Sequence, residues 1–297
     1  MWQKALLQLK KIPVDPKQRL VISRSLGWES QSEVNFQSAG RYRINGILSI
    51  PRTRGKVPAV ISFHDYREDM EPDRAFGQAG LAHLSIQLRG HADSAETPAT
   101  PVGAPTEPVA PRLLEQAGLD PLDESYPFLC FLDALRSVDF LRLQKSIDHR
   151  RLGLLGKGFG AAMAVFTAAV MKESILAMAL ERPGFLWLPQ WLEDGQSDMV
   201  AEVRSLMGTT NNRLRGRIRK NLELMDPLNW SELLKPPVMA SIGLEDEENP
   251  PRPAFGFFNH LKAEKFMEIY PSEADDPDGR EQRKKSVRFL AENLAKK

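Results

Sequence analysis

The sequence has 297 residues, and its 40 Lys and Arg side chains against 39 Asp and Glu leave a formal net charge of +1. Such a chain, 42% hydrophobic, can bury a large core, which excludes a disordered protein. The balanced charge argues against nucleic-acid binding, which normally needs a basic surface. Cys130 is the single cysteine, so an internal disulfide is excluded. This cysteine usage is typical of a reducing compartment, and we expect a cytoplasmic protein.

Charged residues interrupt the apolar stretches of the chain. In residues 1–15, lysines alternate with apolar residues at helical spacing, which predicts a docking helix rather than a signal peptide. No stretch approaches the roughly 18 consecutive apolar residues that a membrane helix requires. We therefore expect no membrane anchor.

Short apolar strands alternate with amphipathic helices, a pattern typical of a mostly parallel sheet covered by helices on both faces. The first predicted strands, at 33–36 and 42–50, precede this alternation and suggest an N-terminal pair. The remaining predicted strands are residues 58–63, 81–88, 152–155, 237–242 and 265–270, and the predicted helices are 128–143, from 161, 255–261 and from about 282.

Two segments do not fit this rhythm. Residues 96–111 contain five prolines and predict a long surface loop. Residues 186–230 predict a helical insertion over one end of the sheet. We predict a single domain spanning residues 1–297, in which residues 1–56 form an N-terminal helix and strands.

A glycine-rich turn joins the predicted strand at 152–155 to the helix after it, with the sequence Gly-Lys-Gly-Phe-Gly at residues 156–160. Strand, G-x-x-x-G and small-residue helix together have the geometry of a nucleophile elbow, where a helix N-terminus supplies N–H groups to an oxyanion. The central residue is Gly158, which offers no nucleophilic oxygen. By itself the turn is equally compatible with a tight strand-to-helix connection or a phosphate cradle.

The whole chain resembles the acetyl xylan esterase and cephalosporin C deacetylase family of α/β-hydrolases. The resemblance is carried by five segments, each similar to a segment of that family: WQKALLQLKKIPVDP, PAVISFHDY, LSIQLRGHADS, SYPFLCFLDALRSVDFLRLQKSIDHRRLGLLGKGFGAA and GLEDEENPPRPAFGFFNHLKAEKFMEIYP. It implies an α/β-hydrolase fold with N-terminal antiparallel strands, no cofactor, acetylated sugars or small esters as ligands, and a homo-oligomeric assembly.

The departures from the family pattern fall on its chemistry. The resemblance places Gly158 at the nucleophilic serine and Asp275 at the catalytic histidine, while Asp246 matches the triad acid. It also places the oxyanion hole at the backbone N–H groups of Tyr66 and Phe159. The family's His-Gly-Tyr reads His-Asp-Tyr at residues 64–66, and its Arg-Gly-Gln reads Arg-Gly-His at residues 89–91.

Few other groups are candidates to replace the missing reagents. His91 follows a predicted strand where the family's pocket lies and has the chemistry of a general base. Lys157 would need burial to become a nucleophile, and Cys130 lies on an apolar helix face, so a solvated lysine and a packed cysteine are favoured. His64 and His260 are assigned no role in the triad. If Asp246 and Asp275 approach one another, their repulsion would favour a raised pKa or a bound cation, although we expect no metal site.

A basic cluster lies within the predicted insertion. Its five positive charges fall within eight residues, at Arg213, Arg215, Arg217, Arg219 and Lys220. Because aromatic residues are not interleaved with it, a solvated face is favoured over a nucleic-acid site.

We therefore predict a catalytically impaired or inactive homologue of the acetyl esterases that acts by binding or assembly. The alternative is an active carboxylic-ester hydrolase with machinery rebuilt around His91, Asp246 and Asp275.

Overall fold

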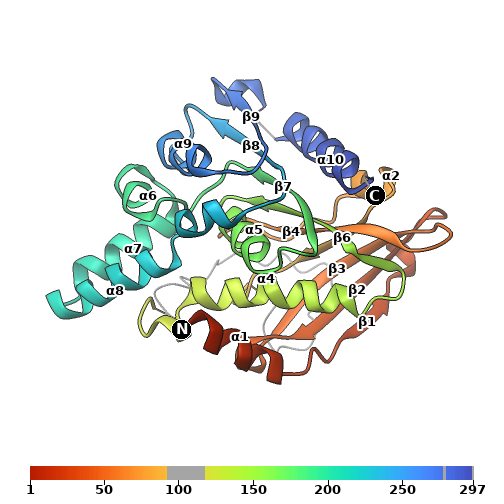
Figure 1. The fold of residues 1–297 in the computed structure, drawn as a ribbon, viewed down its shortest axis with the longest axis horizontal. Helices are drawn as coiled ribbons and strands as arrows, with labels where there is room; N and C mark the ends of the chain where they lie inside the picture. The colour runs from red at the N-terminus through yellow and green to blue at the C-terminus, as the bar shows by residue number, and fades with distance from the viewer. Residues whose placement is uncertain (92–117, 277–278, 296–297) are drawn as a thin grey trace.

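A nine-stranded sheet runs through the computed structural model, which describes residues 1–91, 118–276 and 279–295 (Figure 1). The order of its strands is β1-β2-β3-β5-β4-β6-β7-β8-β9. Pairing is antiparallel from β1 through β2 and β3 to β5, and parallel from β5 through β4 to β9. The strands are β1 (Lys17–Leu20), β2 (Glu29–Gln37), β3 (Arg43–Pro51), β4 (Val57–Phe63), β5 (Ala82–Ile86), β6 (Ile147–Lys157), β7 (Ile175–Glu181), β8 (Val238–Gly243) and β9 (Lys265–Tyr270).

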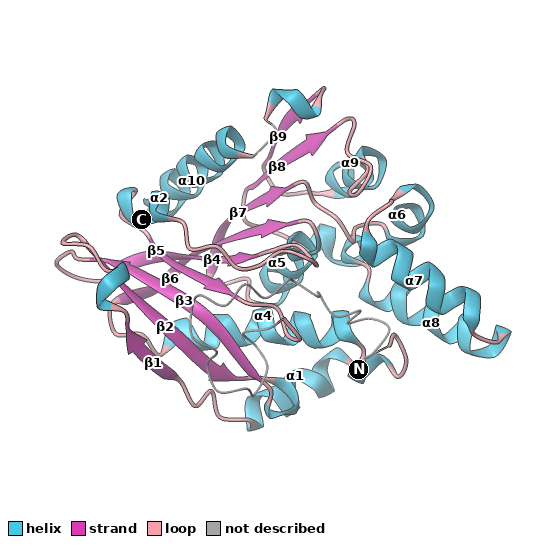
Figure 2. Cartoon of the chain, turned by 180° about the vertical axis from the view of Figure 1, so that it is seen from behind, coloured by secondary structure: helices cyan, strands magenta, loops and turns pink. Residues whose placement is uncertain are grey.

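Helices cover both faces of this sheet, as the two opposite views show (Figures 1 and 2). One face carries α4 and α5, against which α1 packs, and the other carries α2 and α10. In the chain, the three helices α6, α7 and α8 come between β7 and β8, which are neighbours in the sheet. The α-helices are α1 (Trp2–Lys11), α2 (Arg74–Gln78), α4 (Tyr126–Arg142), α5 (Phe159–Val170), α6 (Leu188–Asp194), α7 (Asp198–Thr209), α8 (Asn212–Met225), α9 (Pro251–His260) and α10 (Arg280–Ala295). Short 3-10 turns lie at Ile22–Arg24, Ala39–Arg41, Leu122–Glu124, Pro227–Leu233 and Glu273–Asp275.

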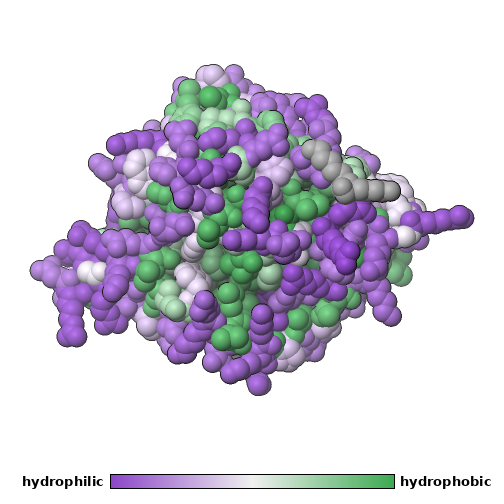
Figure 3. All heavy atoms as spheres, viewed as in Figure 1, coloured by the Kyte–Doolittle hydropathy of each residue, from purple (hydrophilic) through white to green (hydrophobic). Residues whose placement is uncertain are grey.

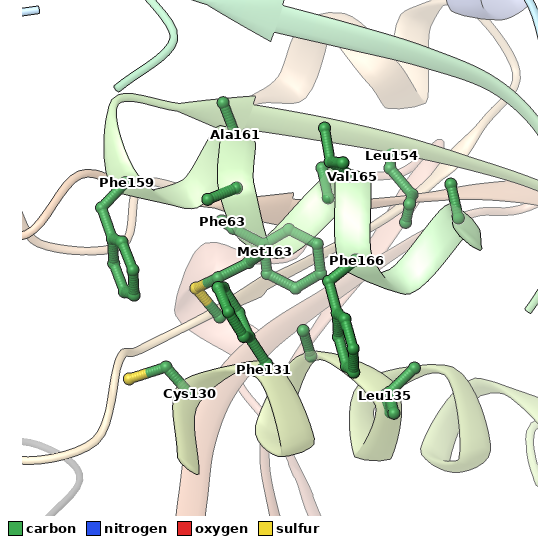
Figure 4. Packing of buried hydrophobic residues seen from close by; sticks show 14 of the residues in the cluster. Phe63, Cys130, Phe131, Leu135, Leu154, Phe159, Ala161, Met163, Val165 and Phe166 are labelled. Carbon is green, nitrogen blue, oxygen red and sulfur yellow. The ribbon is translucent and has the colours of Figure 1, made fainter. Parts of the chain in front are cut away.

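The central strands are buried on both faces, and their successive side chains enter different cores. Ile61 of β4 packs in the larger cluster on the α4 and α5 side, whereas its neighbour Val60 packs in the smaller cluster with α10. Alternation along a strand explains this division. Figure 4 shows the larger cluster, in which Phe131 of α4 faces Phe166 of α5 with ring centroids 5.1 Å apart.

The structure confirms the α/β-hydrolase fold that the sequence predicts, including the antiparallel N-terminal strands. The strand predicted at 265–270 is β9, and the predicted docking helix is α1, whose Leu9 is buried. Two strands were absent from the prediction, β1 and β7. The proline-rich loop predicted at 96–111 lies outside the described residues.

The predicted insertion contains the helices α6, α7 and α8, and the last two project from the body of the molecule (Figure 1). The surface there is largely hydrophilic (Figure 3). In the basic cluster of α8, Arg215 donates to the carbonyls of Met207 and Thr210, and Arg217 donates to Asp120. No helix in the described part of the chain is long and apolar enough to cross a membrane.

Candidate active site

The turn between β6 and α5 is as tight as the glycine spacing predicts. Gly158 has φ 51° and ψ −121°, a backbone conformation that side-chain-bearing residues rarely adopt. At Gly160, a Cβ would overlap the backbone carbonyl of Phe63 at the end of β4. The N-terminus of α5 therefore lies close to the carboxyl end of β4, with its first N–H groups left over from the helix's own hydrogen bonding.

The predicted oxyanion hole is occupied by a carboxylate of the same chain. The backbone N–H groups of Tyr66 and Phe159 both donate to Oδ1 of Asp65, each at 2.7 Å. These are the two N–H groups that the resemblance assigns to the hole, and they converge on a single oxygen. Asp65 thus lies where the resemblance places the negatively charged oxygen of a reacting ester.

The same carboxyl group also fills the space above Gly158. A Cβ built on Gly158 would overlap all three atoms of the Asp65 carboxyl group. The other oxygen, Oδ2, accepts a long hydrogen bond of 3.5 Å from the side-chain amide of Asn249. A serine at position 158 and the present position of Asp65 are therefore incompatible.

Burial raises the pKa of Asp65 to about 6, although the hydrogen bonds from Phe159 and Tyr66 lower it. A folded pKa above the unfolded value of 3.8 means that the folded protein binds this proton more tightly. Burying the charged carboxylate therefore lowers the free energy of unfolding at pH values well above 6, and this destabilisation decreases as the pH falls through 6.

We expect the free energy of unfolding to depend on pH through this group. Between pH 8 and pH 5, protonation of Asp65 should stabilise the wild type by about 1.4 kcal/mol relative to Asp65→Asn, whose amide stays neutral. Urea unfolding of both proteins at the two pH values measures this difference. An equal pH dependence in wild type and variant would contradict the raised pKa.

Asp246, which the resemblance matches to the triad acid, is buried and bound on both oxygens. Its Oδ2 accepts from Nε of Arg182 at 2.6 Å, and its Oδ1 accepts from the backbone N–H of Asn249 at 2.9 Å. A guanidinium thus pairs with this acid, whereas the acid of a catalytic triad pairs with an imidazole. Asn249 connects the two carboxylates, because its backbone contacts Asp246 and its side chain contacts Asp65.

Asp275 lies on an exposed turn after β9 and serves as a capping residue. Its Oδ2 accepts from the backbone N–H of Ser272 at 2.8 Å, in a capping box. The next residue, Asp276, accepts from the N–H groups of Glu281 and Gln282 at the start of α10. Asp246 and Asp275 thus have separate partners. Among the described residues no group of three His, Cys, Asp or Glu side chains is arranged to hold a metal ion.

His91 is buried beside the site, with its ring 5.1 Å from that of His64. Burial lowers the pKa of His91, and its Nδ1 lies 4.0 Å from a carboxylate oxygen of Asp69. Its Nε2 has no hydrogen-bond partner within the described residues. By contrast, both nitrogens of His64 are engaged, one with the carbonyl of Asp65 and the other with the N–H of Leu88, as a structural role requires.

The remaining sequence candidates have structural partners. Lys157 is ion-paired with Glu68, and Cys130 is buried, which raises the pKa of its thiol. His260 hydrogen-bonds the carbonyl of Gly256 within α9. The ring of Phe159 is buried and contacts those of Phe131 and Phe185.

A cavity of about 170 Å³ opens beside Asp65 and is lined also by Phe159, Phe185, Trp191, Met199 and Asn249. Sequence reasoning named Tyr66 and Phe159 for this cavity but missed Asn249, and it also missed Arg182, the partner of Asp246. The only signal for Asn249 was its position in the acidic segment GLEDEENPP, three residues after Asp246.

Comparison with known proteins agrees with this architecture. The acetyl xylan esterase (AXE1) family matches residues 1–293. Acetyl xylan esterase 1 from Thermoanaerobacterium sp. JW/SL YS485 superposes with a TM-score of 0.81 at 19% identity, covering 97% of this chain and 92% of that one. An acetyl xylan esterase from Paenibacillus sp. R4 gives a TM-score of 0.80 at 21% identity, covering 98% and 93%. Est1E from Butyrivibrio proteoclasticus, solved with ferulic acid, gives 0.60 at 16% identity, covering 86% and 97%. The chain therefore belongs to the acetyl xylan esterase family.

Proposed function

We propose that this esterase-like protein has lost the serine-dependent hydrolysis of esters and acts by binding a small molecule at the same site. The observation that carries the proposal is the pair of 2.7 Å hydrogen bonds from Tyr66 and Phe159 to Asp65. An ester carbonyl has to displace this carboxylate before the two N–H groups can stabilise its oxyanion.

The charge of Asp65 opposes the reaction further. A tetrahedral intermediate carries its negative charge on the oxygen held by the oxyanion hole. If Asp65 stayed nearby, two negative charges would be brought together in a partly buried site, where their repulsion is weakly screened. Gly158 supplies no oxygen for attack, and Asp246 is bound to Arg182, so two further parts of a triad are missing or engaged elsewhere.

We expect the wild-type protein to release no acetate from 4-nitrophenyl acetate or acetylated xylose above the level of Asp246→Ala. Loss of a triad serine or histidine lowers kcat about 10⁶-fold, so we expect a large difference in hydrolysis rate between this protein and a competent esterase. The Thermoanaerobacterium acetyl xylan esterase serves as the positive control. Hydrolysis by the wild type that disappears in Asp246→Ala would contradict the proposal.

A second candidate function is an active hydrolase with rebuilt machinery around His91, Asp246 and Asp275. It is favoured by one observation, the buried Nε2 of His91 without a partner in the described residues, which would be available to a water molecule. In that case the measured hydrolysis would be lost in His91→Gln. Hydrolysis that survives both this substitution and Asp246→Ala would exclude the second candidate.

The sequence also predicts a cytoplasmic location and a homo-oligomer, and both stay predictions. Sedimentation equilibrium of the purified protein measures its subunit number. An assembly role without small-molecule binding would appear as an oligomer whose thermal stability does not respond to ligands.

A further inference from the structure

Tyr66 contributes to the oxyanion hole through its backbone and contacts the helical insertion through its side chain. Its N–H donates to Oδ1 of Asp65 at 2.7 Å, while its phenol O–H donates to Oε2 of Glu202 on α7 at 2.9 Å. The ring is buried and lies edge-on to that of Tyr126, with centroids 5.6 Å apart. Because a buried hydroxyl needs an acceptor, the carboxylate of Glu202 fixes the far end of this ring.

The next residue, Arg67, is bound to the same helix. Its guanidinium donates to Glu202 at 3.2 Å and pairs with Asp198, also on α7, at 2.9 Å. Glu202 is itself buried, and the charge of Arg67 compensates the charge of its carboxylate. One carboxylate of the insertion therefore holds two consecutive residues of the loop that follows β4.

The two N–H donors of the oxyanion hole differ in what holds them. The N–H of Phe159 is at the start of α5 and is fixed by the helix and by the tight turn at Gly158. The N–H of Tyr66 belongs to a loop, since β4 ends at Phe63, and its position depends on the contacts of the loop residues. Burial opposes the charged form of Asp65, so the carboxylate is stable in the hole only while both donors are in place.

We propose that Glu202 is a positioning residue that keeps Asp65 in the oxyanion hole, by holding Tyr66 and Arg67 against α7. The inference rests on the proposed function, in which Asp65 blocks the hole, and it gives the helical insertion a part in that blockade. Removal of the Glu202 carboxylate takes this acceptor from the buried O–H of Tyr66. The loop then gains an open state in which Asp65 leaves both N–H groups.

Hydrogen exchange of the Tyr66 and Phe159 amides, followed by NMR at pH 7, reports this open state, because both amides are bonded to the same carboxylate oxygen. Glu202→Leu should speed the exchange of both amides by about tenfold or more, the factor expected for the loss of one buried hydrogen bond. Glu202→Gln keeps an oxygen that accepts from the same donors, so it should retain most of the wild-type protection. Glu223→Leu, the same substitution at an exposed position of α8, should leave both exchange rates unchanged.

Unchanged exchange of the two amides in a folded Glu202→Leu protein would overturn the inference, as would an equal loss of protection in Glu202→Gln. An acceleration of the same size throughout β6 would overturn it too, because it would show a general loss of stability. Tyr66→Phe provides a second route if Glu202→Leu does not fold. It removes only the phenol O–H and keeps the ring, and it should also accelerate exchange of the Phe159 amide; no acceleration there would refute the role of Glu202.

The ester assay fails or succeeds separately. Hydrolysis by the wild type would refute the proposed function. Unchanged amide exchange in a hydrolytically silent protein would refute the positioning role of Glu202 alone.

Discussion

Gly158→Ser is expected to yield a protein without esterase activity and with a free energy of unfolding lowered by about 3 kcal/mol. Two costs add. The positive φ of residue 158 disfavours any side chain by about 1–3 kcal/mol, and overlap with the carboxyl group of Asp65 adds the roughly 1–3 kcal/mol typical of overpacking. Urea denaturation measures the stability, and 4-nitrophenyl acetate measures the activity.

Asp65→Gly in the Gly158→Ser background should recover the part of this loss that comes from overlap. The two substitutions are then non-additive by at least about 1 kcal/mol, as expected for residues in contact. Gly80→Ser is the matched control, because Gly80 also has a positive φ but has open space around its Cβ position. Additive effects of the two substitutions would show that Asp65 does not occupy the place of the serine.

The largest expected loss of stability comes from Asp133→Ala. Arg89 and Asp133 form a buried, bidentate ion pair, with two hydrogen bonds of 2.7 Å, and the guanidinium also lies 4.9 Å from the ring centre of Tyr42. Burial alone would lower the pKa of Arg89, but the charge and hydrogen bonds of Asp133 outweigh it and raise the pKa. Removing Asp133 leaves a buried charge unpaired, which costs about 3–5 kcal/mol. Urea unfolding measures this loss.

Two comparisons separate this pair from ordinary surface charges. Replacing both partners, as Arg89→Met with Asp133→Leu, should cost much less than Asp133→Ala, because no unpaired charge remains. Lys284→Ala, which breaks the exposed pair with Glu281, should leave the unfolding midpoint unchanged. If Asp133→Ala lowered the free energy of unfolding as little as Lys284→Ala does, the claim that the unpaired charge of Arg89 is costly because it is buried would be wrong.

Elements with a strong local pattern were predictable from the sequence. The strand at Lys265–Tyr270 and the helix at Trp2–Lys11 follow from residue type and spacing alone. β7, Ile175–Glu181, reads ILAMALE, in which Ala, Leu and Met favour a helix as much as a strand. Only its parallel neighbours β6 and β8 decide its conformation. β1 has four residues, all exposed, and therefore no hydrophobic alternation to detect.

The candidate site was predictable in its backbone and not in its side-chain contacts. Glycine spacing predicted the turn at Gly158, because the steric demand of a tight strand-to-helix connection is local. The bond between Asp65 and Phe159 joins residues 94 positions apart, and that between Asp65 and Asn249 joins residues 184 apart. No local pattern contains such information. An aspartate in the segment His-Asp-Tyr was visible in the sequence, but its direction depends on where the sheet places β4 beside β6.

Because Asp65 and its two N–H donors belong to one chain, the carboxylate competes for them as a tethered ligand. A tethered group acts at an effective concentration of millimolar or far more, depending on how rigidly it is held. Free acetate or another dissolved anion has to exceed that local concentration to take its place. A single side chain on a fixed loop is thus sufficient to make the anion site permanently saturated, without any change in the turn that forms it.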